Sequence, residues 1–278
     1  MPPAQRKPRA RTYDPAKVRA ALVAQVRALQ HAVDPLCAAS DAGLLLDGPT
    51  RLGDWTVREL IVHIAACLDT LPRLLAERPA PAKAELDLQG YLRALRGQAE
   101  EIAGGLAAEM AALPGSAGPK AVRDRLDAAA DRFCAAVAEA DGATPLATRF
   151  GAMSVDDFLV TRLLETVVHG DDLTAATGAA IAHDRQALAT VTRLTADALA
   201  AKTPGGSVEV RIPPFAVVQC VEGPKHTRGT PPNVVETDPW TWIRLATGRV
   251  EWTDAVDAAL VSASGERADL SGQLPVLG

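Results

Sequence analysis

The stretch Glu165-Thr166-Val167-Val168-His169 places a carboxylate and an imidazole four residues apart in an otherwise apolar segment. On a helix these two side chains lie on one face, one turn apart, and can reach a common point. A second apolar run much earlier in the chain, Glu59-Leu60-Ile61-Val62-His63, ends in another imidazole. Two imidazole nitrogens and one carboxylate oxygen form the three-ligand set of an open zinc site, so the pattern suggests a metal centre drawn from two helices.

The same residues also have a simpler interpretation. A histidine in an apolar helix is commonly a core residue that hydrogen-bonds a backbone carbonyl. The burial cost of an ionised Glu165 favours a cation nearby, because an unpaired buried carboxylate is strongly destabilising. Cys67 follows His63 by four residues and shares its face, so it is an additional ligand, a redox-sensitive thiol near the metal or a small core residue.

Length and charge limit the possible classes of protein. The chain has 278 residues, enough for one large core or two smaller ones, and we expect two domains. A net charge of -5 with dispersed lysines and arginines argues against a nucleic-acid partner and favours a small-molecule substrate or hydrophobic ligand. No apolar run is long enough to span a membrane. The four cysteines form no paired motif, which fits a reducing cytoplasm; the sequence leaves the oligomeric state open.

Apolar periodicity and capping residues predict a helical region over residues 15–203. Asp14-Pro15 opens the first helix, Thr56 and Glu59 form a capping box for the second, and Ser154 and Gly178 bound the helix that carries Glu165. The basic, proline-containing residues 1–14 are expected to form a flexible tail, with no apolar signal-peptide core after them. The predicted helices span residues 15–37, 56–76, 86–112, 119–140, 154–177 and 185–202, with Gly104-Gly105 and Pro114-Gly115 interrupting the middle of the region.

Composition changes near Thr203, where we place a domain boundary. Residues 204–278 predict a small α+β domain, since β-branched runs alternate with turns and short helices. Strands are expected at 207–212, 215–221, 233–237 and 260–264, and helices at 239–245 and 252–259. Trp240, Trp242 and Trp252 in this region either line an apolar ligand pocket or form the domain core.

Two motifs carry a resemblance to a known family. They are Trp55-Thr56-Val57-Arg58-Glu59-Leu60-Ile61-Val62-His63 and Glu165-Thr166-Val167-Val168-His169-Gly170-Asp171-Asp172-Leu173. In these motifs the first 200 positions resemble the DinB-like, mycothiol-dependent maleylpyruvate isomerase metal-binding family of actinobacteria. The resemblance implies a four-helix bundle, here with extra helices, and a metal, usually zinc, held by His63, Glu165 and His169. It also implies mycothiol as the thiol cosubstrate.

The C-terminal region carries a second resemblance. Residues 208–238, followed by a helix and glycine within 238–249, look like the bacterial sterol-carrier-protein orthologue domain. The expected fold is therefore multidomain, α and α+β: a flexible basic tail over 1–14, a DinB-like metal-binding helical bundle over 15–203, and a small sterol-carrier-like α+β domain over 204–278.

The chain also departs from the family pattern. Residues 79–119 match no part of the isomerase, and no position matches its substrate-binding arginine. Four arginines remain as candidates for that role, each of which could instead form a structural salt bridge: Arg211, Arg228, Arg244 and Arg249. The sequence assigns no catalytic residue.

These features favour a zinc-dependent, thiol-using enzyme, a mycothiol-dependent isomerase or thiol transferase, whose C-terminal domain helps to bind substrate. The alternative is a non-enzymatic carrier of lipid or another hydrophobic molecule with the bundle as scaffold. In a third interpretation the metal is purely structural. Whether the chain is an enzyme at all depends on which of the three holds.

Four further residues have weaker support as members of the predicted metal site. Asp172 either hydrogen-bonds an imidazole N–H of the metal site or forms a cap or surface salt bridge. His31 could enter the bundle but has no partner spacing, and His183 precedes a helix start and is expected to be exposed. His226 lies in a basic stretch that either binds an anionic group or is a solvated turn.

Overall fold

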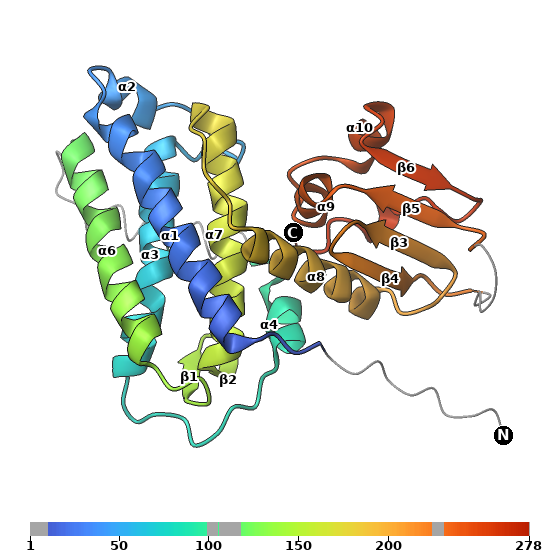
Figure 1. The fold of residues 1–278 in the computed structure, drawn as a ribbon, viewed down its shortest axis with the longest axis horizontal. Helices are drawn as coiled ribbons and strands as arrows, with labels where there is room; N and C mark the ends of the chain where they lie inside the picture. Colours follow the sequence, from blue (N-terminus) through green and yellow to red (C-terminus); the bar gives the residue numbers. More distant parts are fainter. Residues whose placement is uncertain (1–10, 99–104, 106–117, 224–230, 278) are drawn as a thin grey trace.

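A computed structural model describes residues 11–98, 105, 118–223 and 231–277. Its N-terminal part is a bundle of four long helices, which pack side by side in Figure 1. They are α1 (Pro15–Ala38), α3 (Val57–Ala76), α6 (Pro119–Glu139) and α7 (Val155–Thr177). The short helices α2 (Ala42–Leu46) and α4 (Leu88–Leu95) are additional to these four. The predicted four-helix bundle with extra helices is confirmed.

Local signals at the helix ends explain where the long helices begin. The Asp14 carboxylate accepts the first free backbone N–H groups of α1, and Thr56 and Glu59 form the predicted capping box at the start of α3. Ser154 caps α7, and Gly178 ends it with a φ of 72°, a left-handed conformation that glycine adopts without a steric penalty. These caps fix where α3 and α7 begin, and both helices carry candidate ligands.

The structure differs from the prediction in the segment that connects α3 and α6. A helix was expected from residue 86, but α4 ends at Leu95 because Arg96 is extended and Gly97 has a φ of 75°. Residues 96–98 of that predicted helix are not helical, and of its remaining part, 99–112, only residue 105 is among the described residues. A hairpin that the sequence analysis missed, β1 (Pro145–Thr148) and β2 (Gly151–Ser154), leads directly into α7.

The C-terminal part is built on a four-stranded sheet in the order β4-β3-β5-β6, within the described residues. The strands are β3 (Val208–Ile212), β4 (Ala216–Cys220), β5 (Val234–Thr237) and β6 (Val261–Ser264). β3 runs parallel to β5 and antiparallel to β4. Every second residue of β3 is buried, as expected for a strand with one face on the core. All four strands fall where the sequence predicted them, and the α+β class is confirmed.

Helices α8 (Arg185–Lys202), α9 (Pro239–Ala246) and α10 (Trp252–Asp257) accompany the sheet, with a 3-10 turn, η1 (Ser271–Gln273), near the C-terminus. α8 contacts α1 and α7 of the bundle and also α9 and β4, so it joins the two parts (Figure 1). The buried Trp242 donates its indole N–H to Thr195 of α8 at 2.8 Å. Trp240 and Trp252 are half-buried and pack against the core, which favours the core role for all three tryptophans.

The remaining fold predictions concern the chain ends and membrane insertion. Residues 1–10 of the predicted tail lie outside the described residues, while Arg11 donates to Asp197 of α8 at 2.7 Å. Of the helices that the structure describes, none has the length and apolar character to cross a membrane.

Candidate metal centre

The structure brings the three predicted ligands together. His63 lies on α3, and Glu165 and His169 lie one turn apart on α7. One ligand atom from each falls within 4.8 Å of the others, and the two imidazole rings meet edge to face with centroids 4.8 Å apart. Ligands of one zinc ion at about 2 Å each lie up to about 4 Å apart, so this spacing is close to that of a coordination sphere.

Glu165 provides the negative charge of the group. Its Oε2 lies 3.2 Å from His169 Nε2, and its Oε1 lies 3.9 Å from the Arg162 guanidinium. Burial tends to raise the pKa of Glu165, but the hydrogen bond from His169 and the charge of Arg162 hold that pKa well below its usual range. The carboxylate is therefore ionised at neutral pH and available to a cation.

His169 is oriented by a second carboxylate. Its Nδ1 donates to Asp172 Oδ2 at 3.0 Å, which leaves Nε2 facing Glu165 and His63. A metal-binding histidine commonly donates its other ring N–H to a carboxylate in this way. Burial disfavours the charged imidazole, but the hydrogen bonds to Asp172 and Glu165 raise the pKa of His169 overall. Of the roles left open for Asp172, the contact with an imidazole is the one observed, together with ion pairs to arginine.

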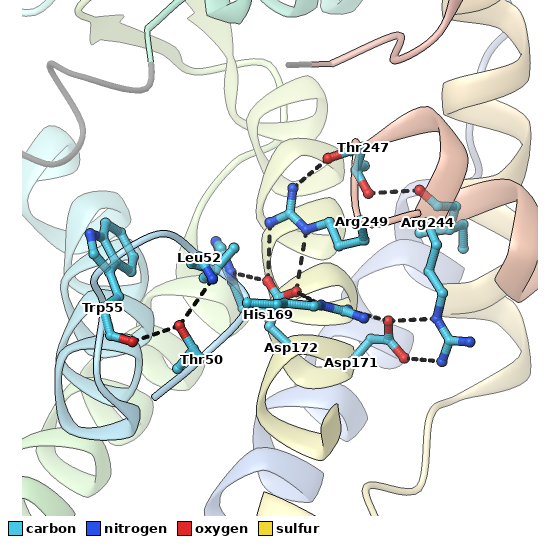
Figure 2. Close-up of polar contacts among 11 residues, drawn as sticks. Thr50, Leu52, Trp55, His169, Asp171, Asp172, Arg244, Thr247 and Arg249 are labelled. Carbon is cyan, nitrogen blue, oxygen red and sulfur yellow. Dashed lines mark hydrogen bonds and ion pairs between the residues drawn. The ribbon is translucent and has the colours of Figure 1, made fainter. Parts of the chain in front are cut away.

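Five residues form an ion cluster on the opposite side of His169: Arg51, Asp171, Asp172, Arg244 and Arg249. Arg244 makes two hydrogen bonds to Asp171, at 2.6 and 2.9 Å, and Arg249 makes two to Asp172, at 3.0 and 3.2 Å (Figure 2). Arg51, from the loop before α3, contacts both carboxylates and lies 2.7 Å from Asp172. The cluster links the C-terminal domain to the helix that carries the candidate ligands.

His63 is held by a different set of neighbours. Its ring packs against Trp55, with centroids 5.0 Å apart, and its Nε2 lies 3.3 Å from Cys67 Sγ. Burial lowers the pKa of His63, which keeps the imidazole neutral, the form that binds metals. Burial also raises the pKa of Cys67 to about 11, so this residue is a protonated thiol near neutral pH.

A cavity of about 1120 Å³ opens beside the three candidate ligands. Trp55, Tyr91 and Arg162 form part of its wall on the bundle side. Thr247, Arg249 and Leu277 of the C-terminal domain contribute to the same cavity. Its volume exceeds the usual upper range for a single small-molecule site, so it has room for two small molecules at once.

The arginines considered for substrate binding are engaged elsewhere or lie outside the described part. Arg211 donates to Glu209 on its own strand at 2.7 Å, and Arg244 and Arg249 belong to the ion cluster. Arg228 and His226 fall among residues 224–230, which the structure does not describe. Salt bridging is thus the observed role of Arg211, Arg244 and Arg249.

The other two histidines among the described residues, His31 and His183, are not part of the group of three candidate ligands. His31 is exposed on α1 and does not enter the bundle. His183 was expected to be exposed, and this prediction is wrong: it is half-buried because Trp240 of α9 packs edge to face against it at 4.6 Å. Gln25 of α1 also lies within 3.0 Å of its Nδ1. The partners of His183 come from distant segments, so no local sequence signal marks its burial.

Sequence reasoning did not single out Arg51 or Tyr91, although one joins the ion cluster and the other lines the cavity. Arg51 lies in a loop with no periodic pattern. The adjacent carboxylates Asp171 and Asp172 in an apolar helix were a usable signal, since two buried acids require cationic partners.

Fold and site together define a two-domain protein whose helical bundle gathers two imidazoles and a carboxylate beside a large cavity. Residues 22–174, more than half of the chain, match the model of the mycothiol maleylpyruvate isomerase N-terminal domain. The chain belongs to this family. Residues 184–276 match the bacterial SCP ortholog model; this match includes α8, which the boundary expected near Thr203 assigns to the bundle, so that boundary stays a prediction.

Solved structures show the same fold. The chain is similar to the crystal structure of the mycothiol-dependent maleylpyruvate isomerase, with a TM-score of 0.60 and 16% identity over 91% of this chain and 93% of the other. A mutant of that isomerase with one histidine replaced by alanine gives a TM-score of 0.59 and 17% identity over the same shares. Among curated proteins, no significant match is found.

Proposed function

We propose that the chain is a metal-dependent, thiol-using enzyme of the mycothiol-dependent isomerase or thiol-transferase type. The single observation that carries this proposal is the clustering of His63, Glu165 and His169 within 4.8 Å on the wall of a cavity built by both domains. A purely structural metal needs no adjoining cavity, whereas a catalytic site keeps a coordination position open to small molecules.

The residues present fit a divalent metal, with zinc as the first candidate. Two neutral nitrogen donors and one ionised oxygen donor are the set that zinc prefers at catalytic sites. The pKa directions of two ligands agree, since His63 is kept neutral by burial and Glu165 is kept ionised by its neighbours. The carboxylates raise the pKa of His169, so metal binding there must displace a proton from its Nε2. When bound, the metal supplies Lewis-acid chemistry that lowers the pKa of a thiol or water in its open position.

The chain's own residues then orient and enclose the reactants. Asp172 holds His169 in the orientation that directs Nε2 at the centre. Trp55 packs against His63 and covers one side of the site. Thr247, Arg249 and Leu277 give the C-terminal domain its proposed role, which is to close the cavity and help to bind substrate.

A thiol-dependent isomerisation matches this arrangement. A thiolate adds to one carbon of a C=C bond that is conjugated to a carbonyl, and the electron pair of the broken π bond moves onto the carbonyl oxygen as an enolate. The resulting single bond rotates, and the returning electron pair re-forms the C=C bond and expels the thiolate, so the thiol is regenerated. Such a reaction needs space for a thiol and a substrate together, which a cavity of about 1120 Å³ offers. Because the solved relatives are titled mycothiol-dependent maleylpyruvate isomerase, mycothiol and maleylpyruvate are the first compounds to test.

The location that suits this chemistry is the cytoplasm. Cys37, Cys67, Cys134 and Cys220 are all free thiols, as is usual for proteins kept in a reducing compartment. We therefore propose a cytoplasmic enzyme acting on a small-molecule substrate.

The decisive test is metal analysis of the purified protein. We expect one zinc or other divalent ion per chain, and loss of that ion in His63→Ala and Glu165→Ala. His31→Ala is the matched control, because His31 is exposed on α1 and far from the cavity wall. Absence of stoichiometric metal, together with unchanged stability of His63→Ala, would support the hydrophobic carrier instead.

A second measurement separates an enzyme from a structural metal. Consumption of maleylpyruvate should require both mycothiol and bound metal, and should disappear in Glu165→Ala but persist in His31→Ala. If the metal is present but neither mycothiol nor another small thiol perturbs its coordination, as read by cobalt-substituted absorption spectra, the structural interpretation replaces the enzymatic one.

A further inference from the structure

Arg162 is a buried cation on the wall of the cavity. It lies on α7, one turn before Glu165, and only 5% of its surface is exposed. Arginine is among the residues least often fully buried unless it is paired with an anion. The contacts of Arg162 therefore show whether its charge is already neutralised.

No close ion pair neutralises Arg162 within the described residues. Its nearest carboxylate oxygen is Glu165 Oε1, at 3.9 Å, whereas an arginine–carboxylate hydrogen bond is about 2.7–2.9 Å long. Its Nη2 lies 3.5 Å from the Tyr91 hydroxyl, and its Nε lies 3.3 Å from the Thr161 hydroxyl. The Cys67 thiol is a further, weak acceptor. All of these contacts are long or involve neutral partners.

The arginines of the ion cluster behave differently. Arg249 also lines the cavity, but two of its nitrogens bind Asp172 and the third donates to the Thr247 carbonyl at 2.7 Å. Arg244 makes two hydrogen bonds to Asp171. Both guanidinium groups are thus paired with a carboxylate of α7, and binding a ligand anion would require breaking that pair. Arg162 has no such close ion pair among the described residues, so it can bind a ligand anion without breaking one.

We propose that Arg162 binds a carboxylate of the ligand in this cavity, with the Tyr91 hydroxyl as a second donor. Tyr91 is buried on α4, lines the same cavity and lies beside the Arg162 guanidinium. A ligand carboxylate between them receives a charge-assisted hydrogen bond and a hydroxyl hydrogen bond. The ring of Phe158, 4.8 Å from the Arg162 guanidinium carbon, supports the cation from one side.

The position of this pair fits a carboxylate-bearing substrate, the class to which maleylpyruvate belongs. Arg162 and Glu165 are one turn apart, so a carboxylate held by Arg162 places the adjoining carbon atoms next to the candidate metal centre. Arg162 thus positions the carboxyl end of such a substrate, with its reactive carbons toward Glu165 and the candidate metal centre. This class rests on the proposed function, while the binding of a carboxylate by Arg162 stands on its own contacts.

The test measures binding of maleate, a short dicarboxylate, by isothermal titration calorimetry on the full chain as purified. Wild-type protein should bind maleate, and Arg162→Gln should weaken that binding by at least about tenfold, the loss expected for hydrogen bonds to a charged group. Arg162→Lys should retain part of the affinity, and Tyr91→Phe should weaken binding by roughly threefold. Arg27→Gln, an exposed arginine on α1, is the control for net charge.

Two further measurements make the result specific. Maleamide, which has the same carbon skeleton without charge, should not bind. Metal content is determined on each sample, so that the two proposals fail separately: maleate binding that depends on Arg162 in a metal-free protein supports the carboxylate site and contradicts the metal enzyme. If the protein binds metal and is active with the thiol, but Arg162→Gln leaves the affinity for maleate unchanged, the carboxylate site alone is contradicted.

The proposal is overturned if wild-type protein does not bind maleate, or if Arg162→Gln and Tyr91→Phe bind it as the wild type does. If Arg162→Gln fails to fold, Arg162→Lys and Tyr91→Phe decide the matter. Unchanged affinity in both would assign Arg162 a purely structural role beside Glu165 and Phe158.

Discussion

Helices α1 and α7 have nearly equal lengths, 24 and 23 residues, and both run through the bundle, but they are buried in different ways. α1 buries one stripe that is apolar except for Gln25, and its other face is open to solvent. α7 is buried on almost every side from Phe158 to Leu173, and that buried stretch includes Arg162, His169, Asp171 and Asp172.

The difference arises from what surrounds each helix. α1 contacts α2, α6, α7 and α8 but keeps one face exposed. α7 contacts α1, α3, α4, α8 and β2 and also receives Arg244 and Arg249 from the C-terminal domain. A helix enclosed on all sides can hold charged groups only if each finds a partner. α1 is thus stabilised mainly by apolar packing, while α7 depends in addition on polar contacts with distant segments.

The strongest way to test this contrast is to remove one polar partner from α7. Asp172 is fully buried and binds His169, Arg51 and Arg249. Asp172→Ala leaves those groups without their acceptor, and we expect a loss of about 4 kcal/mol in the free energy of unfolding, as for other broken buried ion pairs. Urea denaturation measures this loss. Asp131→Ala, which breaks an exposed pair with Arg27, should change stability by less than about 1 kcal/mol.

The matching change in α1 removes apolar packing instead. Leu22 is fully buried in the bundle core, and Leu22→Ala should cost about 3 kcal/mol through lost burial and the cavity left behind. Leu44→Ala is the control, because Leu44 is 77% exposed and should cost less than about 0.5 kcal/mol. Metal content should stay unchanged in Leu22→Ala. Loss of metal there would contradict the separation between the packing role of α1 and the site role of α7.

The contrast also explains what the sequence could reveal. The stripe of α1 repeats at helical spacing, and Asp14, Thr56, Ser154 and Gly178 mark helix ends by local chemistry, so these elements were predictable. The approach of His63 to Glu165 and His169 was also expected, from the four-residue spacing of Glu165 and His169 and from the resemblance to the isomerase family. Their role as metal ligands stays a prediction.

The partners of the polar groups in α7 were not predictable in the same way. Arg51, Arg244 and Arg249 lie in loops or short helices that are distant from α7 in the sequence. Nothing in their neighbouring residues indicates which carboxylate each arginine binds. The burial of His183 by Trp240 has the same long-range origin. The hairpin β1–β2 was missed because its strands begin with Pro145 and Gly151 and contain only one β-branched residue, Thr148, a composition that is not typical of strands.

Acid should affect the contacts of α7 more than those of α1. Burial tends to raise the pKa of Asp171, but the hydrogen bonds from Arg244 and Arg51 lower it overall. A carboxyl whose pKa is lower in the folded state stabilises the fold above its unfolded pKa, and that stability is lost as pH falls through the folded value. Stability should therefore fall as pH is lowered from about 5 toward 2. Asp171→Asn should show a shallower fall, measured by urea unfolding across this range; an identical slope would contradict the assignment.

The smallest effects should appear at the helix ends, where α1 and α7 are alike. Asp14 accepts backbone N–H groups at the start of α1, and Ser154 accepts one at the start of α7. Both contacts are local, so Asp14→Ala and Ser154→Ala should each cost about 1 kcal/mol in the free energy of unfolding. Asp14→Asn and Ser154→Thr retain an acceptor and should restore most of it. A much larger loss of stability for Ser154→Ala than for Asp14→Ala would mean that α7 is already enclosed at its first turn. Equal losses would mean that the two helices differ only in the buried polar stretch of α7 after Phe158.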